Sequence, residues 1–388
     1  MSNCLSAKLW GRTMMRIGSG QLILMACGVL AGLLAASPLP QQEEEEPKTQ
    51  VLALPPDPPA VSRAEAARLV FHVAPLSADG LLSKQTENAL KALARANRRN
   101  RIIHLRAFVA GSGDTRRVQT VVSEFFSRKR QILPSLTVVQ VGQLPVQGAQ
   151  VVMESVAESR KDENPHGLAF LSGQTVATGE AVLEVAPLAM ESVGKIAAAA
   201  VDLGSDPALD VVRVTCYCSS LDDGAEVRRS MAAAFPHAAL NHLQLRRVYT
   251  HAAVTCEAVV RLKAPPPAPL ELANPRPLPP AVGFSHAALV APGGVIFSTA
   301  QLAFRYGDSD VKLAFGRLGE SLKEAKVSFG DVAIVHFYAL PTGISERIRE
   351  LKFDFFDRQR PPANTLLEVE GLPSLDTSFA MDVVAVVR

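Results

Sequence analysis

The stretch Met381-Asp382-Val383-Val384-Ala385, near the end of the chain, has two counterparts, Cys256-Glu257-Ala258-Val259-Val260 and Met153-Glu154-Ser155-Val156-Ala157. Each is an apolar, strand-forming run with one acidic residue at its second position. A turn-like position precedes the acid by 79, 83 and 81 residues, at Pro75, Gln174 and Gln301 respectively. One pattern that returns three times at nearly constant spacing predicts three tandem copies of one folding unit.

Within each copy the expected order is strand, helix, strand, helix, strand, strand. In the last copy we expect a hairpin of 287–290 with 294–297 across Pro292-Gly293-Gly294, and an amphipathic helix over 311–325. A buried strand over 332–340 follows. In the middle copy the first strand is expected to end in a turn at Ser172-Gly173-Gln174.

These repeats, with the Pro-rich and Glu-rich stretches between them, predict six segments along the chain. They are a leader over 1–37, a linker over 38–65, repeat units over 66–158 and 164–262, a linker over 263–279, and a third repeat unit over 280–388.

The leader is basic and partly apolar. The first 42 residues lack Asp and Glu, and an apolar run of fifteen residues extends from Leu22 to Ala36. A membrane span needs about 20 residues, so the run is short for one. Basic, acid-free leaders are typical of mitochondrial presequences. We therefore predict mitochondrial import, with secretory targeting or membrane anchoring as the alternative, and membrane contact only through an uncleaved leader.

The composition is that of a globular protein, with 48% hydrophobic and 20% charged residues. The net charge of +2 argues against a general polyanion binder. Basic residues do cluster over 95–101 and 128–130. We interpret these clusters first as solvated helix ends and second as phosphate contacts, which makes RNA a candidate partner beside proteins.

Five cysteines form no even-numbered disulfide framework. Cys216 and Cys218 alternate along one expected strand, and Cys256 lies on another, so we interpret all three as small buried hydrophobic residues. No spacing typical of a metal site, phosphate loop or dinucleotide fingerprint occurs, and we predict no metal and no cofactor.

Several short motifs resemble one known family. They are the Ser172-Gly173-Gln174 segment, the strand Val212–Tyr217, the helix end Phe355-Phe356, the step Pro362-Ala363 and the turn Leu372-Pro373. On these motifs the chain resembles the Rid family, also labelled YjgF or L-PSP endoribonuclease-like. The resemblance implies a chorismate-mutase-like α+β fold that assembles as a trimer, with sheets inside, helices outside and ligand clefts between neighbours. Three fused copies would form an intramolecular pseudo-trimer.

The resemblance also implies a chemistry, the hydrolysis of enamines or imines as in 2-iminobutanoate/2-iminopropanoate deaminases. An Arg clamps the substrate carboxylate, and an acid on the closing strand transfers protons. The Arg position is Asn364 in copy three and Leu136 in copy one, and residues 237–241 offer no Arg. The remaining candidate positions of these degenerate clefts are Ser172, Gln174, Glu257, Phe284, Ser298, Gln301, Asp382 and Glu154.

Loss of the clamp at all three positions predicts that the chain is not an enzyme. We interpret the acids Glu154 and Glu257 as structural groups satisfied at an interface rather than as catalysts. The leading hypothesis is a structural or assembly subunit of a larger complex, for which a mitochondrial ribonucleoprotein is the candidate. The alternatives are a deaminase-type hydrolase and a small-molecule-binding module that uses one divergent cleft.

Overall fold

The computed structural model describes residues 55–111, 114–246, 251–305, 307–340 and 343–388. The predicted leader over 1–37 lies outside these residues. From Leu54 to Arg388 the chain forms one compact unit rather than three separate domains. Within the described part of the chain, no helix is both long enough and apolar enough to span a bilayer.

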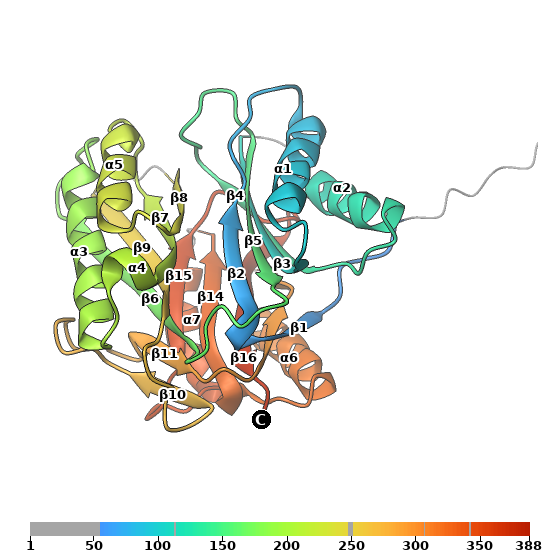
Figure 1. The fold of residues 1–388 in the computed structure, drawn as a ribbon. Helices are drawn as coiled ribbons and strands as arrows, with labels where there is room; N and C mark the ends of the chain where they lie inside the picture. Colours follow the sequence, from blue (N-terminus) through green and yellow to red (C-terminus); the bar gives the residue numbers. More distant parts are fainter. Residues whose placement is uncertain (1–54, 112–113, 247–250, 306, 341–342) are drawn as a thin grey trace, which may run out of the picture. The chain divides into compact units, whose positions relative to one another are not determined.

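Three mixed β-sheets form the body of this unit, one for each repeat (Figure 1). In spatial order, the first sheet contains β2 (Leu69–Val73), β5 (Val151–Glu158), β3 (Arg101–Ala110) and β4 (Ser135–Val141). The second contains β10 (Leu270–Ala273), β11 (Ala287–Val290), β6 (Leu168–Thr178), β9 (Ala252–Arg261), β7 (Val211–Cys218) and β8 (Ala239–Gln244). The third contains β1 (Val61–Glu65), β12 (Gly294–Ser298), β16 (Thr377–Val386), β14 (Val332–Ala339) and β15 (Ala363–Glu368), with β13 (Gln301–Phe304) also paired to β16.

Every sheet has the same centre. A middle strand (β3, β7 or β14) pairs antiparallel with the closing strand and parallel with the strand after the second helix. The predictions of an α+β class and of three similar sheets in tandem are therefore confirmed.

Helices cover the outer face of each sheet (Figure 1). They are α1 (Leu82–Ala96) and α2 (Thr115–Arg128) on the first, α3 (Ala186–Asp202), α4 (Pro207–Asp210) and α5 (Gly224–Ala234) on the second, and α6 (Asp308–Glu324) and α7 (Ile344–Leu351) on the third. Three short 3-10 turns lie at Ala66–Arg68, Phe329–Asp331 and Lys352–Asp354. Apolar residues recur at helical spacing, as in Leu90 and Leu93 of α1, and both are fully buried against the sheet.

The inner faces of the sheets pack against one another. Phe108, Tyr217 and Tyr338 come from the three middle strands and share one buried apolar cluster. Full burial of such a side chain stabilises the fold by about 1.5–3 kcal/mol. Each sheet is thus covered on both faces, which explains why its strands are almost continuously apolar.

Strands from neighbouring segments of the chain extend the second and third sheets, and the predicted hairpin of 287–290 with 294–297 is wrong. β11 pairs with β6 of the second sheet, whereas β12 pairs with β1 and β16 of the third. β11 thus extends the second sheet beyond β6, and β1 extends the third sheet beyond β12, so that the backbone groups of β6 and β12 on those sides are paired. β1 and β10 therefore turn parts of the two predicted linkers, 38–65 and 263–279, into strands.

Ser172-Gly173-Gln174 is a bulge and not the predicted turn, because β6 continues through it with a register shift between Leu171 and Gln174. A Cβ on Gly173 would lie 2.6 Å from Thr255 Cγ2 and 3.0 Å from Thr365 Cγ2, so only glycine fits. The Gly173 amide donates to Thr365 Oγ1 of β15 (3.0 Å). The bulge therefore presses the second sheet against the third.

The structure also corrects the interpretation of the cysteines. Cys216 and Cys256 lie opposite each other on β7 and β9, with their Cα atoms 4.1 Å apart, and form a disulfide. Cys218 is buried and free, and burial raises the pKa of its thiol to about 12. The pairing depends on strand register, which spacing along the sequence does not reveal.

Candidate functional site

The three closing-strand acids occupy equivalent places in their sheets. Glu154 lies opposite Arg106, Glu257 opposite Thr215, and Asp382 opposite His336 of the corresponding middle strands. All three acids are almost completely buried. Since the inner faces of the sheets meet, these side chains gather between the sheets.

Arg106 joins two of the acids. Its Nε and Nη2 donate to Glu154 Oε2 at 3.0 and 2.7 Å, and Nη2 also donates to Glu257 Oε1 at 2.7 Å. Thr215 and Asn241 donate to the other Glu154 oxygen at 2.7 and 2.8 Å. One arginine thus links the first and second sheets through a buried ion pair on each side.

His336 joins the other pair of acids. Its Nδ1 lies 2.8 Å from Asp382 Oδ1, and its Nε2 lies 3.2 Å from Glu257 Oε2. The hydroxyls of Thr137 and Tyr338 donate to Asp382 Oδ2 at 2.7 and 3.1 Å. We call Arg106, His336, Glu154, Glu257 and Asp382 the central network, since together they connect all three sheets.

The central network holds its acids in the ionised form. Burial favours the neutral form of Glu257, but Arg106, His336 and Arg213 outweigh it and hold the pKa well below its usual value. Asp382 behaves likewise: burial opposes ionisation, but His336 lowers its pKa to about 2. Burial lowers the pKa of His336, but the two acids more than compensate and raise it. These carboxylates therefore have no proton to give at neutral pH.

Three cavities lie where the repeats meet, with volumes of about 460 Å³ between the second and third, 380 Å³ between the third and first, and 760 Å³ between the first and second. Asn364, Leu136 and Leu240 have equivalent register positions on β15, β4 and β8, and each lines a different cavity. None of the three acids lines any of these cavities.

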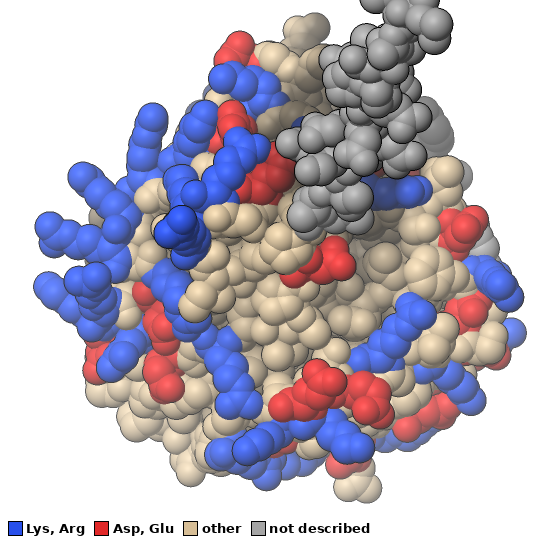
Figure 2. All heavy atoms as spheres, turned by 90° about the vertical axis from the view of Figure 1, so that its right-hand side faces the viewer, with Lys and Arg blue, Asp and Glu red and all other residues tan. Residues whose placement is uncertain are grey.

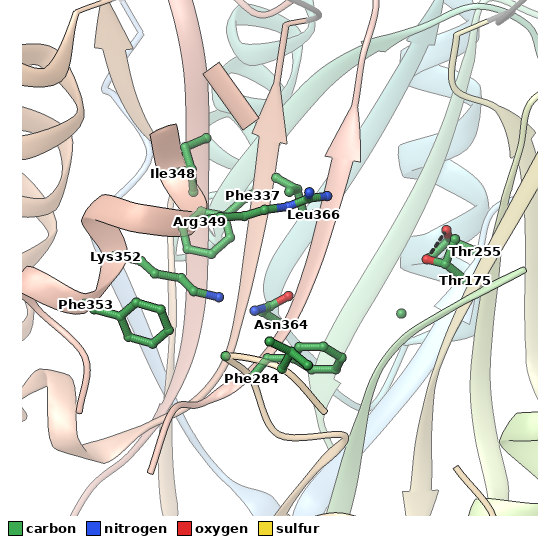
Figure 3. Close-up of a pocket in the computed structure, with 13 residues that line it drawn as sticks. Thr175, Thr255, Phe284, Phe337, Ile348, Arg349, Lys352, Phe353, Asn364 and Leu366 are labelled. Carbon is green, nitrogen blue, oxygen red and sulfur yellow. Dashed lines mark hydrogen bonds between the residues drawn. The ribbon is translucent and has the colours of Figure 1, made fainter. Parts of the chain in front are cut away.

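The cavity between the second and third repeats, which we call the 2–3 cleft, is distinguished by a buried cation. The Lys352 side chain extends into it, as Figure 3 shows, although the residue is only 6% exposed. Among the described residues no acid pairs with Lys352. Its ammonium lies 5.1 Å from the Phe353 ring. Burial, with Arg349 nearby, lowers the pKa of Lys352 to about 8.

Polar and apolar groups surround this lysine. Asn364 also points into the 2–3 cleft, and the exposed residue Arg349 of α7 contributes to its lining (Figure 3). On the opposite wall the hydroxyls of Thr175 and Thr255 lie 2.8 Å apart. The rest of the lining is mostly apolar, namely Val282, Phe284, Phe337, Ile348, Phe353 and Leu366. Such a cavity suits a small anion with an apolar body.

The candidate residues therefore separate into three groups. Phe284 and Asn364 line the 2–3 cleft, and Gln301 lines the cavity between the third and first repeats. A second group is buried and lines none of these cavities; it contains Ser172, Gln174 and Ser298. The Gln174 side chain donates a hydrogen bond to the Ser172 hydroxyl, and the Ser298 hydroxyl accepts one from the Val383 amide at 2.9 Å. The acids Glu154, Glu257 and Asp382 belong to the central network.

Sequence reasoning missed Lys352 and Arg106. Lys352 follows a charged helix and is typical of a surface residue; nothing local marks it as buried. Arg106 did carry a signal, because it stands alone inside the apolar strand 102–109, as the glutamates stand alone in the closing strands. A lone charge in a buried strand needs an opposite charge from another strand.

No protein-family model matches the chain, and no curated protein matches it. Solved structures do. A Rid-family protein from Yersinia pestis is 20% identical over 31% of this chain and all of its own length, with a TM-score of 0.28. A YjgF-family member from Mycobacterium tuberculosis is 17% identical over 30% of this chain and 99% of its own, with a TM-score of 0.23. E. coli TdcF, solved with bound serine, is 19% identical over 24% of this chain and 81% of its own length, with a TM-score of 0.23. The structural similarity of this chain is thus to the Rid/YjgF family, over about a quarter to a third of its length in each case.

Proposed function

We propose that this chain is a non-catalytic, Rid-like intramolecular pseudo-trimer, with sheets inside and helices outside, that acts as a structural subunit of a larger complex. One observation carries the proposal: all three closing-strand acids are buried and engaged in the central network. A general acid must reach its substrate, and these acids do not line the inter-repeat cavities.

The 2–3 cleft supports the same conclusion. On β9 the residue that faces this cleft is Thr255, two positions before Glu257 and on the same side of the strand. The hydroxyl of threonine does not ionise near neutral pH, so it does not replace a carboxylic acid. The lining contains the charged groups Lys352 and Arg349 but no carboxylic acid, so it lacks the proton-transferring acid that the family resemblance implies.

We expect the full chain to be a monomer in light scattering and to hydrolyse the imine derived from 2-aminoacrylate at the background rate. The matched control is E257Q, which should leave that rate unchanged, because Glu257 does not reach the cleft. An active Rid-family deaminase run in parallel shows that the assay works. Turnover above background that K352M abolishes, or a trimeric mass, would overturn the proposal.

Two observations bear on the compartment. The basic leader favours mitochondrial import, in which case a mitochondrial ribonucleoprotein is the complex we propose. The disulfide Cys216–Cys256 favours the alternative, an oxidising compartment such as the secretory pathway. Imaging of a C-terminally tagged full chain distinguishes them, since matrix staining excludes the secretory route.

A second candidate function is favoured by Lys352 itself. A buried ammonium without an acidic partner is costly unless a ligand supplies the negative charge. We therefore propose that the 2–3 cleft binds a small carboxylate with an apolar or aromatic body, recognised by Lys352, Arg349 and Asn364.

Benzoate is a suitable probe, with binding measured by calorimetry. A hydrogen bond to a charged group contributes about 1.5–3 kcal/mol, so K352M should weaken binding roughly 10- to 100-fold. K326M, which removes an exposed lysine outside the cleft, should have no effect. Because Lys352 loses its proton as the pH rises through about 8, affinity should be constant at pH 6–7 and fall above pH 8 in the parent chain only. Equal affinities of the parent chain and K352M would exclude the site.

A further inference from the structure

The three segments that contain the helices and the middle strand of each repeat carry very different charges. From the start of the first helix to the end of the second, repeat one (82–128) has ten basic and three acidic residues. The corresponding segment of repeat two (186–234) has four basic and seven acidic residues, and that of repeat three (308–351) has six basic and seven acidic residues. The net values of +7, −3 and −1 are hidden in a chain whose net charge is only +2.

Most of the positive charge of repeat one is exposed and unpaired. Lys91, Arg101 and Arg128 form ion pairs with neighbouring glutamates, and Arg117 lies 3.9 Å from one. In the described part of the chain, no acid pairs with seven further exposed cations: Lys84, Arg95, Arg98, Arg99, Arg116, Lys129 and Arg130. We call the surface formed by α1, α2 and these seven residues the basic layer. Figure 2, which views the right-hand side of Figure 1, shows Lys and Arg gathered along one side of the molecule, with fewer Asp and Glu among them.

The two helices form one continuous surface rather than two separate ones. Arg117 of α2 donates to Ser83 Oγ of α1 at 3.0 Å, and Arg128 lies 3.9 Å from Glu87 of α1. Between them runs a groove of about 210 Å³, lined by both helices. The helices span roughly 20 Å each at 1.5 Å per residue, which is long enough to follow several phosphates of one strand.

The chemistry of the basic layer favours phosphate over protein or lipid. The two helices expose no large apolar side chain; of the residues that flank them, Leu81 and Ile132 are exposed. Two single side chains do not form the packed anchors of a protein interface or a helix face that inserts into a bilayer. Five of the seven unpaired cations are arginines, whose guanidinium fork matches phosphate oxygens. Exposed aromatic platforms for bases are lacking on these helices, so contact would be to the backbone and independent of base sequence.

We propose that the basic layer binds the phosphate backbone of RNA. The inference rests on the proposed function as a subunit of a larger complex, and it names the partner for one face of that subunit. The negative layer of repeat two and the near-neutral layer of repeat three stay free of RNA, which gives the bound chain one orientation.

The test is fluorescence anisotropy of the full chain with a labelled 20-nucleotide polyuridylate, between 50 and 200 mM salt. The variant R95Q/R98Q/R99Q/R130Q removes four unpaired charges from the basic layer. The matched control R160Q/K161Q/K323Q/K326Q removes four exposed charges elsewhere. Each lost phosphate contact lowers the salt slope by about 0.7, so the variant should lose about 3 in slope and at least tenfold in affinity at low salt. The control should resemble the parent chain.

Three outcomes overturn the inference: no binding by the parent chain, equal losses in both variants, or equally tight binding of polyglutamate of the same length, which would indicate an acidic protein partner. Light scattering and the imine assay on the same sample separate this failure from that of the proposed function. If the chain is a monomer without turnover and does not bind RNA, only the RNA inference is wrong. If the chain shows turnover, the proposed function is wrong whether or not RNA binds.

Discussion

Replacement of Arg106 by Met should lower the free energy of unfolding by roughly 3–5 kcal/mol, the range typical of a buried ion pair that loses one partner. Arg106 is 2% exposed and is the cation shared by Glu154 and Glu257. Methionine fills similar space but leaves both carboxylates buried without the positive charge of Arg106. Those groups then lose the interaction that keeps the pKa of each below its ordinary value. Urea unfolding followed by circular dichroism measures the loss.

Two controls separate charge from packing. R101M removes an exposed arginine of the same strand that pairs with Glu158, and exposed pairs contribute at most about 1 kcal/mol. The triple variant R106M/E154Q/E257Q removes the stranded charges together with the cation, and should recover part of the stability that R106M loses. If R106M unfolds within 1 kcal/mol of the parent chain, the central network does not hold the three sheets together.

Removal of the Cys216–Cys256 disulfide should have an effect of similar size. The crosslink joins residues 40 apart in sequence, and the chain-entropy model gives about 4 kcal/mol for a loop of that length. The double variant C216A/C256A should therefore unfold at clearly lower urea concentration, and reductant should shift the parent chain the same way.

C218A is the matched control for this prediction. Cys218 is equally buried, on the same strand, but free, so its loss should cost only packing, on the order of 1 kcal/mol. Peptide mapping without reductant should recover a crosslinked pair that contains Cys216 and Cys256. Free thiols at all three positions would refute the pairing and remove the argument for an oxidising compartment.

The repeat was readable from sequence because it depends on local patterns. Apolar runs of strand length, helical spacing between them and a single acid in each closing strand recur at nearly equal distances. Each of these signals lies within about ten residues of chain. These local signals predicted the α+β class and the three sheets. They also identified the residue that stands where the family resemblance implies an arginine.

The partners of those residues depended on contacts far apart in sequence. Three features each join segments of different repeats: the pairing of β11 with the second sheet, the ion pair of Arg106 with Glu257, and the position of Lys352 in the 2–3 cleft. The sequence by itself determined the order of strands and helices that returns three times, because strand and helix periodicity are local. Only the tertiary structure decided which acid meets which cation and which cleft keeps an unpaired charge, because those pairings exist only once three inner sheet faces exclude water together.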